Sequence, residues 1–249
     1  MTVLRIATWN IHKGFSQWGR RLMVHELRER LRELAPDIVF LQEVQGLHRR
    51  HAHRHADWPA VPQHEFLAAE FFASAVYGRN AVYDHGHHGN ALLACFPLLA
   101  SDNQDVTHLW FERRGLLHAT LALPKPMPAL HCVNVHLSLL GPSRRRQMRA
   151  LGERLEALIP PDAPLIVAGD FNDWRNRADA LLAARLGLSE AFAVAGGRPS
   201  RSFPAALPLL RLDRIYLRGL RVREVCRHAG PPWSLISDHA ALSATLELP

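Results

Sequence analysis

The sequence has few of the residues that define disulfide-stabilised or fibrous proteins. Its three cysteines, Cys95, Cys132 and Cys226, are too few and too scattered for a disulfide framework. Each stands in an apolar stretch, which predicts a reduced, buried thiol. The 17 prolines and 15 glycines among 249 residues exclude a collagen-like or low-complexity chain.

Long hydrophobic runs are also missing. The longest apolar stretch, residues 91–100, contains Pro97 and is far shorter than the ~20 residues of a membrane-spanning helix. Residues 1–7 alternate like a β-strand and lack the apolar core of a signal peptide. We therefore expect a cytoplasmic protein without an integral membrane segment.

What the sequence does contain is enough apolar material for a sizeable core and an excess of basic charge. Hydrophobic residues make up 48% of the chain, and no linker-like composition divides it, so we expect one domain over residues 1–249. Lys and Arg total 30 against 23 Asp and Glu, giving a formal net charge of +7. This balance favours an anionic partner, either nucleic acid, a phosphorylated ligand or a lipid surface, although an arginine-rich proteome would produce it too.

Short aliphatic runs bounded by Gly, Pro, Asn or Asp recur along the chain and predict β-strands. They cover residues 3–9, 37–42, 91–95, 116–123, 130–137, 165–168, 212–217 and 240–247. Two segments instead repeat apolar residues every three or four positions, which predicts helices at about 24–34 and 148–159.

These two helices belong to a weak internal repeat. Each leads through a proline break into a buried strand, and each strand ends at an acid, Glu43 in the first copy and Asp170 in the second. The repeat indicates two similar α/β halves that bring their acids to one site, unless the likeness of two helix–strand pairs is chance.

Polar residues stand at the ends of many of the predicted strands. The segments are 8–14, 42–43, 89–90, 134–137, 169–173, 213–214 and 237–239. Carboxylate and amide oxygens suit a hard cation such as Mg²⁺, and a histidine beside an aspartate supplies a group that titrates near neutral pH. No zinc-type cluster of His and Cys is present in the sequence. This inventory favours hydrolysis of a phosphoester.

The same segments, in this order, resemble the signature of the endonuclease/exonuclease/phosphatase superfamily. One such motif alone, for example Ser237-Asp238-His239, is weak, but seven in register from residue 8 to residue 242 are specific. The resemblance implies a four-layer α/β sandwich, with two mixed sheets packed face to face and helices outside.

The resemblance also implies roles for individual residues. Glu43, Asn10 and Asp238 would form the metal side of the site and hold Mg²⁺ or Mn²⁺. Asp170 would orient or deprotonate the attacking water, with the base role left open between this Asp and a His. The remaining catalytic residues would be Asn172 on a phosphate oxygen, His239 at the scissile phosphate, Asp213 as the partner of His239, and His136 as a second phosphate-facing histidine.

Four further residues are candidates for substrate contacts. His12 lies next to the Asn10 motif, Asn90 opens a strand, Asn134 shares a strand face with His136, and Arg144 begins the second helix in a run of three arginines. For several candidates a structural reading stays open: His12 as a solvated side chain, Gly89-Asn90 as an ordinary turn, and His136 as a buried core residue. Asp213 could pair with Arg211 or Arg214 instead of with His239.

Two surface features are ambiguous in the same way. Seven of the eight residues 48–55 are His or Arg, and this segment could clamp a polyanion or form a mobile solvated loop. The tryptophans at positions 18, 58, 110, 174 and 233 lie outside the periodic core segments and could stack on a ligand or pack internally.

The sequence therefore predicts a metal-dependent phosphodiesterase. Two substrates compete: nucleic acid, favoured by the charge, and a phospholipid or phosphosugar diester, favoured because His12 and His136 replace the acid and tyrosine that the superfamily's abasic endonucleases carry at these positions. A catalytically inactive anion-binding module is the remaining alternative, and the intact acids and His239 argue against it.

Overall fold

The computed structural model describes residues 2–17, 21–175, 182 and 185–248, and these form two six-stranded mixed sheets. The first sheet has the strand order β11-β12-β1-β2-β4-β3 and the second has the order β5-β6-β7-β8-β10-β9. The bounds in the first sheet are β1 Thr2–Asn10, β2 Ile38–His48, β3 Ser74–Tyr83, β4 Gly86–Ala94, β11 Arg221–His228 and β12 Ala241–Leu248. Those in the second are β5 Leu98–Asp105, β6 Gly115–Leu121, β7 Leu130–His136, β8 Leu165–Asp170, β9 Ser189–Glu190 and β10 Asp213–Arg218.

Each sheet is centred on one parallel strand pair joined by a helix. Helix α1 (Val24–Leu34) connects β1 to β2, and helix α4 (Gly141–Leu158) connects β7 to β8. A parallel pair needs such a crossover because its second strand must start at the same end as the first. The remaining pairings in both sheets are antiparallel. The helix–strand repeat of the sequence is thus the central unit of both sheets.

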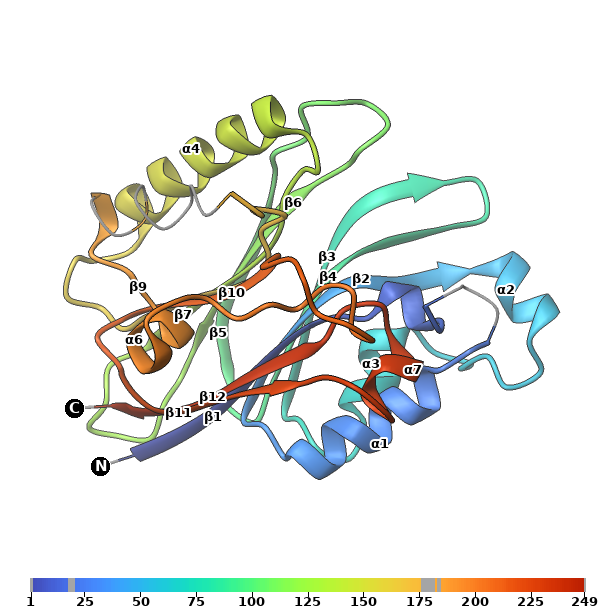
Figure 1. Cartoon of the computed structure of the whole chain (residues 1–249), viewed down its shortest axis with the longest axis horizontal. Helices are drawn as coiled ribbons and strands as arrows, with labels where there is room; N and C mark the ends of the chain where they lie inside the picture. Colours follow the sequence, from blue (N-terminus) through green and yellow to red (C-terminus); the bar gives the residue numbers. More distant parts are fainter. Residues whose placement is uncertain (1, 18–20, 176–181, 183–184, 249) are drawn as a thin grey trace.

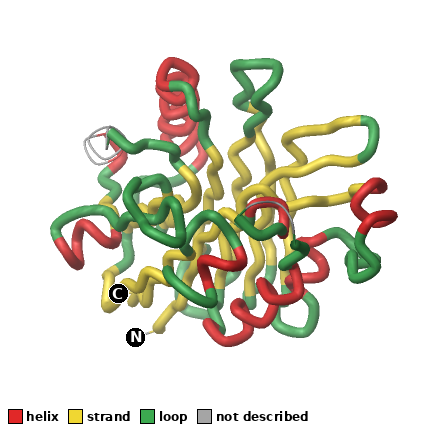
Figure 2. The backbone as a smooth tube through the Cα atoms, turned by 45° about the vertical axis from the view of Figure 1, so that its right-hand side comes forward, coloured by secondary structure: helices red, strands yellow, loops and turns green. Residues whose placement is uncertain are grey.

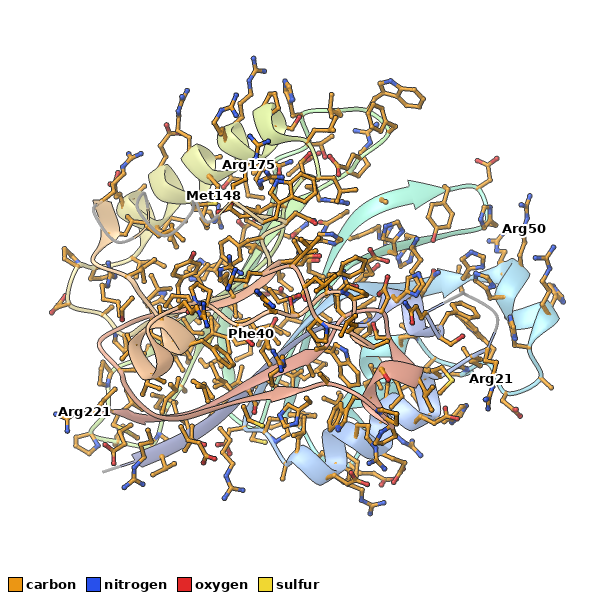
Figure 3. All side chains as sticks on the ribbon, in the orientation of Figure 1. Arg21, Phe40, Arg50, Met148, Arg175 and Arg221 are labelled. Carbon is orange, nitrogen blue, oxygen red and sulfur yellow. The ribbon has the colours of Figure 1, made fainter. Side chains whose placement is uncertain are left out.

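Three apolar clusters separate four layers. The largest lies between the sheets and includes Phe40, near the middle of the molecule (Figure 3). A second packs α4 on the outer face of its sheet through residues such as Met148 and Leu151. The third packs α1 on the other sheet. Figure 1 shows α4 and α1 on opposite outer faces, and Figure 2 shows the strands between them. The predicted α/β/β/α sandwich is confirmed.

Shorter elements complete the chain, and sequence patterning did not predict them. They are the 3₁₀ turn η1 (His12–Gly14) and the helices α2 (Arg49–Arg54), α3 (Gln63–Ala68), α6 (Ala191–Gly196) and α7 (Trp233–Ile236). Each spans too few turns for a 3.6-residue period to be visible. The edge strands β3, β5 and β11 were also missed, because many of their residues are polar and exposed.

Two expectations about the chain need correction. Only Cys132 is buried, whereas Cys95 and Cys226 are exposed: Cys226 lies on the edge strand β11, and Cys95 follows the last residue of β4. Strand β2 also does not end near Glu43, as the motif had suggested, but continues to His48. Among the described helices none has the length and apolarity to cross a membrane.

Candidate active site

The site lies where the inner faces of the two sheets change from apolar to polar. Side chains alternate along a strand, so Ile6 and Asn10 of β1 share one face, as do Ile166 and Asp170 of β8. Ile6 and Ile166 belong to the core between the sheets. Asn10 and Asp170 end their strands, at the opposite end of β1 from the chain termini (Figure 1). The strands themselves therefore carry Asn10 and Asp170 to one end of the sandwich, where the two side chains are hydrogen-bonded.

A buried amide network forms the floor of this site. Asn134 is fully buried, and its side-chain nitrogen donates to the carbonyl oxygens of Leu41 (2.8 Å) and Ala91 (2.7 Å) on the opposite sheet. Its side-chain oxygen accepts from Gln42 at 2.8 Å. Both donor hydrogens of Asn134 are therefore used, so the predicted substrate-binding residue links the two sheets instead of offering a donor to a ligand. The side-chain nitrogen of Asn90 likewise donates to the carbonyl of Gly115.

Asp170 is at the centre of the polar groups. Its Oδ2 accepts from Asn10 Nδ2 at 3.1 Å and lies 3.6 Å from His136 Nε2 and 3.8 Å from His239 Nε2. Its Oδ1 accepts from the backbone N–H of Asn172 at 2.9 Å. Only 1% of Asp170 is exposed. Four other predicted site residues are thus brought within a few ångströms of this carboxylate.

His239 is held from its other side by Asp213. Its Nδ1 and the Oδ2 of Asp213 are 2.8 Å apart, and both residues are buried. The alternative partner Arg214 donates instead to backbone carbonyls, those of Arg211 and Asp213. The backbone also fixes the imidazole, because the His239 carbonyl accepts from the Trp9 indole at 2.9 Å. The Asp213–His239 pair predicted from sequence is therefore formed.

The charges of this cluster are strongly coupled. Burial alone would lower the pKa of His239, but the carboxylates of Asp213 and Asp170 outweigh it and raise the pKa to about 10. Burial, with the nearby charge of Asp213, raises the pKa of Asp170 to about 6. Burial and the cations Arg114 and His239 push the pKa of His136 well below its usual value. At neutral pH, His239 is an imidazolium, His136 a neutral imidazole and Asp170 a carboxylate.

Glu43 reaches the site from an irregularity in β2. The pairing of β2 with β4 shifts register between Leu41 and Val44, and Glu43 in this bulge has a left-handed φ of 57°. A bulge re-aims the side chain it carries. Burial would raise the pKa of Glu43, but Lys13, His239 and His12 together lower it. Lys13 Nζ lies 3.8 Å from the carboxylate.

Strained backbone is concentrated at this site. Six non-glycine residues among the described ones have positive φ, and four of them are site residues: His12, Lys13, Glu43 and Asn172. A left-handed conformation costs an L-residue roughly 1–2 kcal/mol. The fold therefore maintains an unfavourable backbone in order to present these side chains.

Asn10 and Asp238 both contact His12, whose charge acts on Glu43. The backbone N–H of His12 donates to Asn10 Oδ1 at 3.1 Å, and His12 Nδ1 lies 3.9 Å from Asp238 Oδ1. The metal-side candidates Asn10, Glu43 and Asp238 offer only oxygen donors, the set that Mg²⁺ and Mn²⁺ prefer. Asp170, Asp213 and His239 also place one donor atom each within 4.8 Å of one another, but there the protonated His239 already supplies a positive charge. The residues present therefore fit a hard divalent cation on the Glu43 side.

Arg144 does not lie on the rim, where a phosphate contact had been predicted. It is 8% exposed, and its guanidinium donates to the carbonyls of Ser138 (2.8 Å) and Leu139 (2.9 Å). The arginines next to it, Arg145 and Arg146, are exposed. Asn172 keeps one amide hydrogen for a ligand, since the other is donated to the carbonyl of Leu137 at 2.9 Å.

Two basic residues near the site were missed. His88 lies on β4 and interacts electrostatically with Glu43 and Lys13, and burial together with Lys13 lowers its pKa to about 4. Its only sequence signal was its position just before Gly89-Asn90. Arg114, the second missed residue, acts on the pKa of His136 and His88, and its guanidinium donates to the Leu137 carbonyl. Nothing in the sequence around Arg114 indicates this role.

The histidine-rich segment is an ordered aromatic cluster. Residues 49–54 form α2, and His51 stacks on Trp58 with ring centroids 5.2 Å apart. Trp233 packs on Trp9 at 5.3 Å. Trp110 and Trp174 are 80% and 48% exposed. Trp18 lies outside the described residues.

The family follows from comparison with known proteins. Residues 7–239 match the Endonuclease/Exonuclease/phosphatase family, and the chain belongs to this family. Members of this superfamily hydrolyse phosphoester bonds and generally depend on a divalent metal.

Individual relatives extend the match over the whole chain. The uncharacterised protein YbhP of Escherichia coli (strain K12) is 43% identical over 244 residues, which are 98% of this chain and 96% of YbhP. A Bacteroides vulgatus endonuclease/exonuclease/phosphatase structure has a TM-score of 0.77 at 19% identity, covering 100% of both chains. The D. rerio TDP2 structure with a single-strand DNA product has a TM-score of 0.70 at 20% identity, covering 99% of this chain and 100% of TDP2. The structures establish the shared fold.

Proposed function

We propose that this protein is a divalent-metal-dependent phosphodiesterase that cleaves nucleic acid. The observation that carries the proposal is the buried carboxylate of Asp170, which meets an imidazolium, a neutral imidazole and an amide at one end of the sandwich. Such a set can position a water, accept its proton and stabilise charge that develops on a phosphoryl group.

Each residue of the site has its own role in the proposed reaction. Asp170 orients the attacking water and accepts its proton at Oδ2, which lies 3.6 Å from His136 Nε2 and 3.8 Å from His239 Nε2. His239 donates a hydrogen bond from Nε2 to a phosphoryl oxygen, because its Nδ1 is engaged by Asp213. Asn172 donates its remaining amide hydrogen to a second phosphoryl oxygen. The neutral His136 donates a hydrogen bond to a phosphoryl oxygen without adding charge. As the water oxygen bonds to phosphorus, the P–O bond to the leaving alcohol breaks, and the departing alkoxide takes a proton from solvent.

Glu43, with Asn10 and Asp238 beside it, would hold the metal ion. A bound Mg²⁺ or Mn²⁺ supplies Lewis-acid stabilisation of phosphoryl charge. The pKa of Glu43 is below its usual value, so the carboxylate is ionised at neutral pH and ready to accept the cation. Lys13, 3.8 Å from the Glu43 carboxylate, compensates its charge before the metal arrives.

Nucleic acid is proposed as the substrate because the chain as a whole carries an excess of seven positive charges, which favours a polyanionic ligand. The fold neighbour TDP2 was crystallised with a single-strand DNA product, which supports this choice by analogy.

The proposal is tested by hydrolysis of bis-p-nitrophenyl phosphate and of plasmid DNA with Mg²⁺ and with Mn²⁺. We expect activity that EDTA abolishes, that Asp170→Asn and His239→Ala each reduce by at least about a hundredfold, and that falls steeply on DNA as salt rises. Full activity of either variant would refute the mechanism. Activity that resists EDTA would exclude the metal.

One observation favours a phospholipid diester as the second candidate substrate. Trp110 and Phe111 are 80% and 63% exposed, and their rings lie 5.7 Å apart at the tip of the β5–β6 loop. This loop is joined to the loop after β7 by Glu112, which accepts from the backbone N–H of Leu139 at 3.0 Å. Leu139 and Leu140 are themselves at least half exposed. These four residues form an apolar ledge beside the segment that carries His136, and such a ledge suits the interface of a bilayer.

A substrate panel separates the two candidates. If plasmid DNA and RNA remain intact at saturating metal while a phospholipid diester in vesicles is hydrolysed, the lipid replaces nucleic acid. In that case Trp110→Ser should reduce hydrolysis of the vesicle substrate but not of bis-p-nitrophenyl phosphate. An unchanged rate on vesicles would show that the apolar ledge does not take part in hydrolysis of the lipid.

A further inference from the structure

A second basic concavity lies apart from the metal side of the active site. It is a cavity of about 430 Å³ between α6, the edge strand β11 and the loop that leads to β10. Four arginines line it, two from the loop on either side of Ser200, one at the loop's end and one from β11: Arg198, Arg201, Arg211 and Arg227. No acidic side chain is among its lining residues.

These four arginines have no ionic partner in the described part of the chain, where no carboxylate oxygen lies within 4.0 Å of their nitrogens. Some arginines outside the cavity do have carboxylate partners: Arg223 lies 2.8 Å from Glu247, and Arg185 lies 2.6 Å from Glu156. The like charges also act on each other. Burial, with the charges of Arg201 and Arg198, lowers the pKa of Arg211.

The arginines are partly fixed in place by the backbone. The Nε of Arg211 donates to the carbonyl of Pro199 at 2.9 Å, and Arg227 approaches the carbonyl of Arg201 at 3.5 Å. Guanidinium groups held side by side repel one another unless an anion lies between them. Their forked donors match the oxygens of a phosphate group, and the Ser200 hydroxyl lines the same cavity.

We propose that this cavity, named here the arginine pocket, binds a phosphate-bearing anion. The binding itself does not depend on the proposed catalysis. The phosphate can come from two sources, either a free anion or a second phosphate of the substrate bound at the active site.

The arginine pocket is connected to the active site through its own loop. This loop runs from Arg198 to Leu212 and continues directly into Asp213, the partner of His239. On the way, the ring of Phe203 lies 4.9 Å from that of His239, and the Ser202 carbonyl accepts from the backbone N–H of Ala240 at 2.8 Å. An extended substrate with several phosphates could therefore follow this loop from one site to the other.

The test uses inorganic pyrophosphate as the probe and titrates it calorimetrically into the metal-free full-length protein. We expect saturable binding at one site, weakened about tenfold by Arg201→Gln and by Arg227→Gln. Arg221→Gln is the matched control, because Arg221 is exposed at the start of the same strand, outside the pocket (Figure 3). It removes the same charge and should change the affinity less than twofold. Circular dichroism verifies that each variant is folded.

Three outcomes would refute binding at the arginine pocket. They are pyrophosphate binding that does not saturate, an affinity that Arg201→Gln leaves unchanged, and an equal loss of affinity in the control Arg221→Gln. The source is then read from steady-state kinetics with Mg²⁺. A KM that rises in Arg201→Gln for a short oligonucleotide but not for bis-p-nitrophenyl phosphate identifies a substrate phosphate. Unchanged KM values with weakened pyrophosphate binding identify a separate anion. A protein that binds pyrophosphate but hydrolyses neither diester would refute the proposed function and leave the pocket standing.

Discussion

Asp213 occupies a buried position where one of its oxygens contacts His239 and its charge reaches Asp170. Its carboxylate therefore affects two groups at once. It stabilises the protonated form of His239, and it adds to the effect of burial in disfavouring the ionised form of Asp170. Asp213 therefore raises the pKa of both groups that the proposed mechanism uses, His239 as the hydrogen-bond donor and Asp170 as the base.

Replacing Asp213 by Asn should therefore lower both pKa values. The rate is lost in acid when Asp170 is protonated and lost in base when His239 gives up its proton, so both limbs of the profile of kcat/KM against pH should move to lower pH. We expect the maximal rate to fall about a hundredfold, because the imidazole loses its anchoring carboxylate. Asp84→Asn, at an exposed position, is the control. A basic limb that stays in place would contradict the role of Asp213.

At the scale of elements, the bulge in β2 sets the position of Glu43. Its φ of 57° is a conformation that glycine adopts without a steric penalty, whereas alanine retains the penalty. We expect Glu43→Gly to be more stable than Glu43→Ala by about 1 kcal/mol in denaturant unfolding. Both variants should lose metal-dependent hydrolysis. Equal stabilities would show that the bulge is not strained.

A side chain from α4 stabilises the loop that follows β7. Arg144, in the first turn of α4, donates to two carbonyls of this loop and lies 4.0 Å from Asp173. Arg144→Gln should lower the free energy of unfolding by about 2 kcal/mol, because charge-assisted hydrogen bonds to buried carbonyls are lost. Arg145→Gln, one residue further along and exposed, should change it by less than about 0.5 kcal/mol. Similar losses of unfolding free energy in both variants would show that Arg144 does not stabilise the loop after β7.

For the molecule as a whole, the buried amide network of Asn134 joins the two sheets at the end that holds the candidate site. Asn134→Ala would leave the carbonyls of Leu41 and Ala91 without their present donor. We expect a loss of about 3 kcal/mol in denaturant unfolding, with KM unchanged under conditions in which the variant is folded. A raised KM with an unchanged free energy of unfolding would instead support the role in substrate binding that the sequence had suggested for Asn134.

The sequence was informative wherever a pattern repeats over many residues. The eight strand runs and the two long amphipathic helices all correspond to elements of the structure. The two acids of the repeat, Asp170 at the end of β8 and Glu43 in the bulge of β2, come to the same site, where both interact electrostatically with His239. Isolated side chains were less predictable. Arg144 and Asn134 carry the same chemical groups as ligand-binding residues, and only their hydrogen-bond partners show that they act within the fold.

By itself, the sequence determined the strand and helix pattern, and its ordered motifs indicated the family, the layered architecture and most candidate residues of the site, because periodicity and motifs are local properties of the chain. The tertiary structure decided which of these groups act on one another. Asp170 and His239 acquire shifted pKa values through burial and through neighbours distant in sequence. The arginine pocket likewise exists only because β11 folds back beside the loop before β10, so that charges separated along the chain share one cavity.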